Sequence, residues 1–284
     1  MEIGIKSTIE MLELHSIKPS KSLGQNFLTD PNIPKKIVKS AGFDSSAAVL
    51  EIGPGLGALT MQLSAVAGHV TAVELDKRLA KILDEMFIGH SNVDIVQGDV
   101  LKLDVHRLLE NNQDSFEWHV CANLPYNITT PVIAYLLETG LFKSLTFMIQ
   151  KEVAERICAR AGSPEYGAFT VFANYYSAPE MLFDVASESF YPRPKVLSTV
   201  LRLKTAPKRR LGASEEKIFF KVVRAAFGQR RKTLVNALNS VFGNIYSKED
   251  IISFVSECGF DVRIRGEKLS IEDFIALSKH FAKS

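Results

Sequence analysis

The sequence predicts an α/β fold, in which a mainly parallel sheet carries helices on both faces, followed by a small all-helical domain. Short apolar segments alternate with helical patterns through most of the chain, which is typical of βαβ units. A glycine-rich turn follows the first apolar segment, and amphipathic helical patterns dominate the C-terminal part. Residues 204–214, "KTAPKRRLGAS", have the composition of a linker. We therefore expect domains over residues 1–206 and 207–284.

The strands of the sheet are expected where short apolar runs end in turn residues or acids. Four such runs occupy residues 47–53, 69–76, 93–100 and 116–126, with helical patterns over 59–67 and 77–87. Residues 145–160 begin as a strand and continue as a helix. Two strands around a proline-rich loop are expected over residues 181–204, and antiparallel pairing would join them to the far edge of the sheet.

The helices of the C-terminal domain begin at serines. Residues 214–242 carry one long helical pattern with Ser214 as its expected N-cap, and two further helices are expected to start at Ser247 and Ser270.

Composition narrows the class of protein. The chain has 284 residues, 46% of them hydrophobic and 23% charged, which is ordinary for a globular protein. Its three cysteines have no CxxC spacing, which favours a reduced, cytoplasmic protein without a structural metal site. The N-terminus lacks a signal-peptide pattern and no long apolar run is present, so we expect no membrane span.

Charge is distributed unevenly along the chain. Residues 207–284 hold 15 Lys and Arg against 9 Asp and Glu, whereas residues 1–206 hold 19 against 23. A basic C-terminal segment on a mildly acidic body favours a polyanionic partner. The alternative is a solvated charged surface with no partner.

The segment "EIGPGLGALT" (51–60) lies between an expected strand and an expected helix. Gly53, Gly55 and Ala58 fit the G-x-G-x-x-[G/A] pattern, in which glycines allow a tight bend and close approach of a ligand to the backbone. Nicotinamide, flavin and S-adenosylmethionine all remain possible ligands of this pattern, and a plain tight turn is the structural alternative.

Two acids at strand ends favour S-adenosylmethionine. Glu74 ends the second strand, about 20 residues beyond the glycines, where a carboxylate suits the hydroxyls of a ribose. Asp99 ends the third strand, where it could accept from an adenine amino group. Asp99 has an alternative role as the cap of the following helix.

The segment "NLPY", Asn123 to Tyr126, ends the fourth strand. The amino nitrogen of adenine is a poor nucleophile because its lone pair is conjugated into the ring. Two acceptors, the Asn123 side-chain oxygen and the Leu124 carbonyl, would favour a pyramidal nitrogen. Pro125 fixes the local φ, and Tyr126 offers a stacking face worth roughly 1–3 kcal/mol. The segment therefore predicts methyl transfer to N6 by alignment of the reactants, with an ordinary Asn-capped turn as the alternative.

A second aromatic residue supports this interpretation. In "FYPRPKVLS" (190–198), Phe190 precedes a loop that two prolines stiffen. We expect Phe190 to stack on the opposite face of a flipped base from Tyr126. The alternative is a buried ring beside a rigid turn.

Seven motifs follow one another in a characteristic order: "KSLGQNFLTD" (21–30), "EIGPGLGALT" (51–60), "VELD" (73–76), "GDVL" (98–101), "NLPYNI" (123–128), "FYPRPKV" (190–196) and "AFGQRRKTLVNAL" (226–238). Over nearly the whole chain this series resembles the ribosomal RNA adenine N6,N6-dimethyltransferases, most closely the small-subunit KsgA/RsmA family. The resemblance implies a Rossmann-like methyltransferase sheet and S-adenosylmethionine as methyl donor. It also implies dimethylation of two adjacent adenosines near the 3′ end of 16S rRNA on an assembling small subunit.

The resemblance also assigns residues. Asn26 and Leu28 would line the cofactor pocket from an N-terminal arm, beside Gly53 and Gly55 at the methionine portion. Glu74 would bind the ribose and Asp99 the adenine of the cofactor. Asn123, Leu124, Pro125 and Tyr126 would hold the target base, with Asn123 also facing the cofactor.

Basic residues in and before the long C-terminal helical pattern are the candidates for binding rRNA phosphates. They are Arg209, Arg210, Arg224, Arg230, Arg231 and Lys232. We expect a monomer whose partner is the small ribosomal subunit.

Three alternatives remain at this point. A large-subunit adenine methyltransferase of the antibiotic-resistance branch shares the glycine loop and a similar Asn-x-Pro-aromatic motif. An NAD-dependent oxidoreductase would explain the glycines and Glu74 but gives "NLPY" no role. A non-catalytic assembly factor on the same fold is disfavoured by the intact Asn123 and Tyr126.

Overall fold

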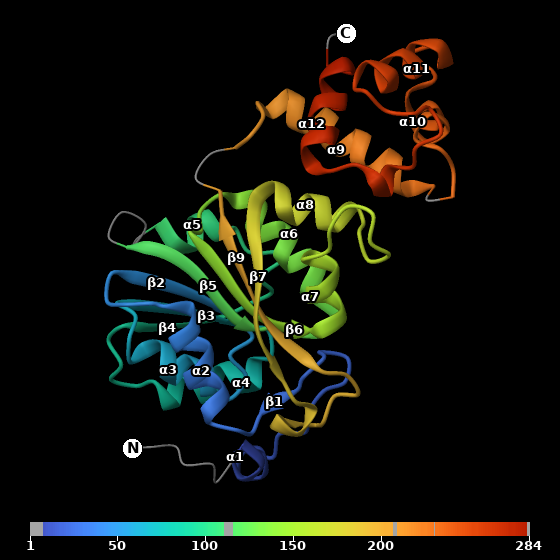
Figure 1. Ribbon diagram of the computed structural model, residues 1–284. Coiled ribbons are helices and arrows are strands. Elements are labelled where there is room, and N and C mark those ends of the chain that lie inside the picture. The colour runs from blue at the N-terminus through green and yellow to red at the C-terminus, as the bar shows by residue number, and fades with distance from the viewer. Residues whose placement is uncertain (1–7, 111–115, 207–208, 230, 283–284) are drawn as a thin grey trace. The chain divides into compact units, whose positions relative to one another are not determined.

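The computed structural model describes residues 8–110, 116–206, 209–229 and 231–282 (Figure 1). The chain forms two compact units. The first consists of Met1–Ala154 with Ala178–Thr205, and the second of Glu155–Ser177 with Ala206–Ser284. The step from one unit to the other at Thr205 lies beside the boundary expected from the linker composition, whereas Glu155–Ser177, expected in the first domain, belongs to the second unit.

A seven-stranded sheet in the order β4-β3-β2-β5-β6-β9-β7 forms the centre of the first unit. Its strands are β2 (Ala47–Ile52), β3 (His69–Glu74), β4 (Val93–Gln97), β5 (Glu117–Asn123), β6 (Ser144–Gln150), β7 (Ser177–Val185) and β9 (Ser198–Thr205). Strands β4, β3, β2, β5 and β6 are parallel, and β9 pairs antiparallel with β6. The predicted parallel sheet and the antiparallel addition of β9 beyond β6 are therefore confirmed.

Helices cover both faces of this sheet. They are α2 (Asn32–Ala41), α3 (Ala58–Ser64), α4 (Lys77–Met86), α5 (Val105–Leu109) and α6 (Thr129–Thr139). Helix α7 (Lys151–Ile157) follows β6 and contains the step from the first unit to the second. Figure 1 shows α2, α3 and α4 along one face and α5 and α6 along the other. All six residues of β2 and of β3 are buried, as expected for central parallel strands covered on both sides.

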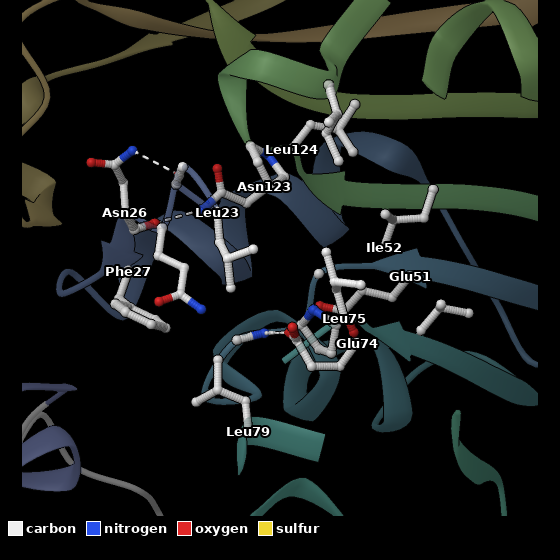
Figure 2. Close-up of a pocket in the computed structure, with 18 of the residues that line it drawn as sticks. Leu23, Asn26, Phe27, Glu51, Ile52, Glu74, Leu75, Leu79, Asn123 and Leu124 are labelled. Carbon is white, nitrogen blue, oxygen red and sulfur yellow. Dashed lines mark hydrogen bonds between the residues drawn. The ribbon is translucent and has the colours of Figure 1, made fainter. Parts of the chain in front are cut away.

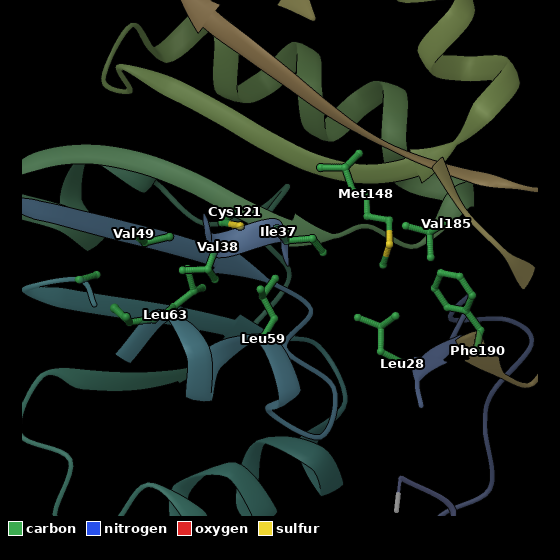
Figure 3. Close-up of a cluster of buried hydrophobic side chains, with 13 residues drawn as sticks. Leu28, Ile37, Val38, Val49, Leu59, Leu63, Cys121, Met148, Val185 and Phe190 are labelled. Atoms are coloured by element: carbon green, nitrogen blue, oxygen red, sulfur yellow. The ribbon is translucent and has the colours of Figure 1, made fainter. Parts of the chain in front are cut away.

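Apolar side chains of α2 and α3 pack on the sheet (Figure 3). Ile37 and Val38 of α2 and Leu63 of α3 join Val49 of β2 and Cys121 of β5 in one buried cluster. This packing fixes the carboxyl ends of β2 and β5, where the candidate site residues lie.

An N-terminal arm, defined here as residues 8–28, crosses these carboxyl ends. It contains α1 (Thr8–Leu14) and β1 (Phe27–Leu28), and β1 pairs antiparallel with β8 (Phe190–Tyr191). Leu12, Ile17 and Phe27 of the arm pack with Leu56 of the glycine loop and Leu79 of α4. Two short 3₁₀ turns, η2 (Tyr126–Ile128) and η3 (Ser187–Ser189), complete the unit.

The second unit is helical. It comprises α8 (Ala168–Tyr176), α9 (Ala213–Gly228), α10 (Leu234–Phe242), α11 (Lys248–Glu257), the turn η4 (Gly266–Lys268) and α12 (Ile271–His280). Helix α9 contacts α8, α10 and α12. Ser247 and Ser270 cap α11 and α12 as predicted, each in a capping box with the aspartate three residues later.

Two predictions about the first C-terminal helix are wrong. The N-cap is Gly212 and not Ser214, because α9 begins at Ala213 and Glu215 bonds back to the Gly212 amide. The expected single helix over 214–242 is divided into α9 and α10. Thr233 starts α10 as its N-cap, with its hydroxyl accepting from the Asn236 amide.

Among the described residues, no helix is both long and apolar enough to cross a membrane. The same part of the chain holds no cluster of three or more His, Cys, Asp or Glu side chains suited to a metal ion.

Candidate active site

A pocket opens at the carboxyl ends of β2, β3, β4 and β5, beneath the N-terminal arm (Figure 2). This is where ligands bind in open parallel sheets. The structure brings most of the predicted site residues together here: Asn26, Leu28, Gly53, Gly55, Glu74, Asp99, Asn123, Leu124, Pro125 and Tyr126 all line the pocket. Segments far apart in the sequence therefore meet at one site.

The glycine loop is built tightly into this site. Gly55 has φ +63°, and a Cβ added there would lie 3.2 Å from the Phe27 ring of the arm. The Gly55 amide donates to Glu74 Oε2 at 3.1 Å, and the Gly53 amide donates to the Val73 carbonyl at 2.9 Å. The left-handed backbone favours glycine here, and a side chain would also press on the Phe27 ring.

Glu74 is held in one orientation at the end of β3. Its side chain is buried, and its Oε1 accepts from the Asp76 amide at 2.8 Å while Oε2 accepts from Gly55. Burial raises the pKa of this carboxyl, and the two amide bonds oppose that shift. Each oxygen keeps a second lone pair, so the carboxylate can still accept from a ligand hydroxyl.

Asp99 does not cap the helix that follows it. Its Oδ1 accepts from the Leu101 amide at 3.1 Å in a local turn, and Asp104 caps α5 instead. Lys102 Nζ lies 3.5 Å from Asp99 Oδ2. The Asp99 carboxylate is therefore fixed at the pocket wall by its own turn, and the helix-cap alternative is excluded.

The "NLPY" segment presents two acceptors to the pocket. The Asn123 Nδ2 donates to the Asn26 carbonyl at 3.2 Å, and the Leu124 amide donates to the Met148 carbonyl at 3.2 Å. Asn123 Oδ1 and the Leu124 carbonyl have no hydrogen-bond partner among the described residues. Because the Asn123 amide bonds to the arm, it does not cap the turn that follows.

Tyr126 is anchored from a different strand. Its hydroxyl lies 2.8 Å from Ser198 Oγ, at the start of β9. Burial raises the pKa of this half-buried phenol, so it is neutral at physiological pH. Ser198 was not among the predicted site residues, because its contact with Tyr126 joins positions that are 72 residues apart in the sequence.

Phe190 is not at the pocket. Its side chain is 4% exposed and packs with Leu28, Met148 and Val185 in the apolar cluster of Figure 3. The β1–β8 pairing places Phe190 opposite Leu28 and turns it to the core, while Tyr191 faces outward and is 42% exposed. The structure thus places this ring under the arm and not against a base, in line with the buried-aromatic alternative.

Glu51 lines the pocket and is not among the predicted site residues. It is 1% exposed in the otherwise apolar strand β2, and its Oε2 has no hydrogen-bond partner in the described part of the chain. Burial raises its pKa to about 8, and the nearby Glu74 contributes in the same direction. An acid within the run "AAVLEI", directly before the glycine loop, was the signal available in the sequence.

Comparison with known proteins identifies the family. Residues 17–283 match the family model described as ribosomal RNA adenine dimethylase. The chain belongs to the ribosomal RNA adenine dimethylase family. A protein of Alkaliphilus oremlandii named ribosomal RNA small subunit methyltransferase A is 43% identical over 280 residues, covering 98% of this chain and 97% of the relative. Its Bacillus mycoides namesake is 44% identical, covering 95% and 94%.

Solved structures agree with this assignment. A dimethyladenosine transferase from Plasmodium falciparum matches with TM-score 0.77 and 27% identity, covering 88% of this chain and 95% of that one. The 23S rRNA methyltransferase ErmE matches with TM-score 0.67 and 26% identity, covering 89% and 98%. Members of the dimethylase family use S-adenosylmethionine, so the oxidoreductase interpretation is not retained.

The pocket of this family member suits S-adenosylmethionine. Three acids, Glu51, Glu74 and Asp99, line it, and no Lys or Arg is among its lining residues. Such a lining favours a cofactor that carries a sulfonium and an ammonium charge over one that carries a pyrophosphate. A cation bound beside the unpaired Oε2 of the buried Glu51 would lower the raised pKa of this carboxyl and favour its ionised, accepting form.

The basic residues assigned to RNA binding have different surroundings. Arg209 pairs with Glu216 at 2.5 Å and Arg210 with Glu272 at 2.7 Å, so both are engaged within the second unit. Arg224 is exposed on α9, while Arg231 and Lys232 are exposed in the turn before α10. The expected helical cluster is therefore a turn beside a helix, and Arg230 lies outside the described residues.

Proposed function

We propose that this protein dimethylates the N6 amino groups of two adjacent adenosines near the 3′ end of 16S rRNA, as a step in small-subunit biogenesis. The observation that carries the choice of subunit is the 43% identity, over almost the full length of both chains, to a relative named for the small subunit. The large-subunit enzyme ErmE has 26% identity, which makes that branch the less favoured alternative.

The chain's part in the reaction is to accept hydrogen bonds and to align the target. Asn123 Oδ1 and the Leu124 carbonyl would each accept one N6 hydrogen, which draws the nitrogen lone pair out of conjugation. The absence of other partners for these two oxygens among the described residues supports this role. Tyr126, with its hydroxyl bonded to Ser198, would stack on the base. The cationic product nitrogen loses its proton readily, so no general base is needed.

The cofactor would be held by the pocket acids and the glycine loop. When bound, S-adenosylmethionine supplies a methyl group on a positively charged sulfur. Gly53 and Gly55 would receive its methionine portion, Glu74 its ribose and Asp99 its adenine, with Asn26 and Leu28 closing the pocket from the arm. Glu51 would lie near its cationic end. Catalysis then rests on alignment and electrostatics.

The exposed cations Arg224, Arg231 and Lys232 would contact rRNA phosphates, which position the enzyme without reading base sequence. We expect Arg209 and Arg210 to contribute less, because acids of the same unit already engage them. We propose that the protein acts as a monomer. It would act in the cytoplasm, where small subunits assemble.

The decisive experiment supplies labelled S-adenosylmethionine to small subunits from a strain that lacks the modification. Large subunits from the same cells are the control, and digested RNA is analysed for N6,N6-dimethyladenosine. Label in the small subunit as dimethyladenosine is the expected result. Label only in the large subunit would move the protein to the resistance branch, and cofactor binding without any label would indicate an assembly factor.

A further inference from the structure

The N-terminal arm reaches directly to the Asn123 amide. The backbone carbonyl of Asn26 accepts a hydrogen bond from Asn123 Nδ2 at 3.2 Å, across 97 residues of sequence (Figure 2). The Asn26 side chain bonds the Gly24 carbonyl at 3.1 Å, which stabilises the turn that presents this oxygen. The arm thus contributes a backbone atom to the surroundings of the proposed base-binding amide.

Close packing holds the arm at this place. Gly24 has φ +63°, and a Cβ added there would lie 2.7 Å from Asn127 Oδ1 and 3.3 Å from Pro125 Cβ. The Gln25 side chain donates to Asp76 Oδ2 at 3.3 Å, which links this part of the arm to the N-cap of α4. The Asn26 carbonyl is therefore fixed relative to the "NLPY" segment and is not a passing contact.

A carbonyl oxygen can only accept hydrogen bonds, so the amide opposite it must present its nitrogen. The contact with Asn26 consequently decides which way the Asn123 amide faces. With Nδ2 committed to the arm, Oδ1 remains as the acceptor, without a partner among the described residues.

We propose that the Asn26 carbonyl is a positioning group that orients the Asn123 amide, so that Oδ1 meets the target amino group. This inference rests on the proposed function, in which Asn123 accepts from the N6 amino group. It explains why this chain carries an amide and not a carboxylate at position 123. A carboxylate would accept equally well from the base, but it could not donate to the arm.

The substitution Asn123→Asp separates these two requirements. An ionised Asp side chain would set a carboxylate oxygen against the Asn26 carbonyl and lose the hydrogen bond. A protonated Asp side chain donates, which restores the hydrogen bond to the Asn26 carbonyl.

The charged groups that face this position are the acids Glu51, Glu74 and Asp99 of the pocket walls, with Asp76 beyond the arm. The ionised acids among them favour the protonated form by repulsion, and Glu51 adds to this only above its pKa of about 8. The positive charge of the bound cofactor would act in the opposite direction. The neutral Tyr126 lies beside these acids.

The first measurement is kcat of Asn123→Asp relative to the wild type between pH 5.5 and pH 8.5, with saturating small subunits and cofactor. Loss of alignment at pH 8.5 is expected to lower kcat by about 100-fold. The ratio of variant to wild type should rise as pH falls, by up to about tenfold per pH unit. Taking the ratio removes the titration of Glu51 and of other groups common to both proteins. Asn123→Ala, which lacks donor and acceptor, is the matched control and should show no recovery.

The second measurement tests the arm itself. Gly24→Ala should displace the arm from Asn127 and Pro125 and lower kcat, and combining it with Asn123→Asp should remove the recovery at low pH. Hydrogen exchange of the amides of residues 20–28, with a β6 peptide as internal reference, should be faster in Asn123→Asp than in the wild type at pH 8.5. This readout requires no turnover, and far-UV circular dichroism verifies that each variant is folded.

The outcomes distinguish the orienting role of the Asn26 carbonyl from the base-binding role of Asn123. An Asn123→Asp variant as active as the wild type at pH 8.5, with Asn123→Ala inactive, would overturn the orienting role and leave the base-binding role intact. Unchanged recovery in the Gly24→Ala background would also overturn it. Full activity of Asn123→Ala would instead refute the proposed function on which the inference rests.

Discussion

Glu51 places a carboxyl group inside an otherwise apolar strand at the wall of the cofactor pocket. Below about pH 4.5 the carboxyl is protonated in both the folded and the unfolded chain, and the group has no effect on the pH dependence of stability. Between pH 4.5 and about 8 the unfolded chain releases the proton while the folded chain keeps it. Stability therefore falls with rising pH in this window, by roughly 1.4 kcal/mol per pH unit from this group.

Glu51→Gln should abolish this contribution. The free energy of unfolding of the variant, relative to the wild type, is expected to increase from pH 5 to pH 8 in urea titrations. Glu13→Gln on the exposed side of α1 is the control and should follow the wild type. A constant difference between Glu51→Gln and the wild type across these pH values would show that Glu51 is ionised in the folded protein.

The Tyr126–Ser198 contact gives a second prediction at the level of residues. Ser198→Ala removes a hydrogen bond to the Tyr126 hydroxyl, worth about 1 kcal/mol, and should lower kcat/KM for methyl transfer by about fivefold. Tyr126→Phe breaks the same bond but keeps the stacking ring. Because both changes remove one interaction, the double variant should resemble each single variant. Additive losses would mean that the two residues act separately.

At the scale of elements, local patterns predicted most of the sheet. Runs such as 47–53 and 69–76 are apolar because both faces of the central strands are covered, and that signal is present in the sequence itself. The pairing of β1 with β8 could not be predicted, since it joins residues about 160 positions apart through two-residue strands without a periodic pattern. The burial of Phe190 follows from that pairing, and its stacking on a base stays a prediction that this packing does not favour.

The division between α9 and α10 was missed for a different reason. Apolar periodicity continues through residues 214–242, but the Thr233 side chain caps a new helix and the Leu234 amide donates to the Ile264 carbonyl. A residue of the α11–α12 connection thus helps fix the break, and no window of local sequence contains it. Because of this break, Arg231 and Lys232 lie in a turn and not in the helix that the sequence predicted.

Thr233→Ala tests the role of this cap. Loss of the side-chain bond at the start of α10 should lower the free energy of unfolding by about 1 kcal/mol. Ser253→Ala, at an exposed position within α11, removes a hydroxyl without removing a cap and should change stability by less than about 0.5 kcal/mol. Equal effects of the two substitutions in urea denaturation would show that the cap does not define the helix start.

At the scale of the whole molecule, the candidate active site and the excess of positive charge lie in different parts of the chain. The pocket walls carry acids, which suit a cationic cofactor, whereas the excess of cations lies in residues 207–284. The numbers of charged residues predict the charge asymmetry, but they do not show which Lys and Arg side chains form ion pairs within the unit. Arg209 and Arg210 are neutralised by Glu216 and Glu272, which leaves the turn before α10 as the stronger candidate for phosphate contacts.

Charge reversal of this turn should therefore affect subunit binding and not cofactor binding. Arg231→Glu with Lys232→Glu is expected to weaken binding to small subunits. It should also reduce the slope of log K against log salt by roughly 1–2, since about 0.7–0.9 of a counterion is released per phosphate contact. Calorimetric titration with S-adenosylmethionine should give the wild-type affinity, because neither residue lines the pocket.

The matched control for this pair is Lys248→Glu with Lys279→Glu. Both lysines are exposed on α11 and α12, and the substitutions make the same change in net charge. If rRNA phosphates contact the turn itself, the control double variant should retain the wild-type slope of log K against log salt. An equal reduction in both double variants would mean that the unit attracts rRNA through its overall field and not through this turn. Loss of cofactor binding in the Arg231 and Lys232 variant would instead reveal a general disturbance of the fold.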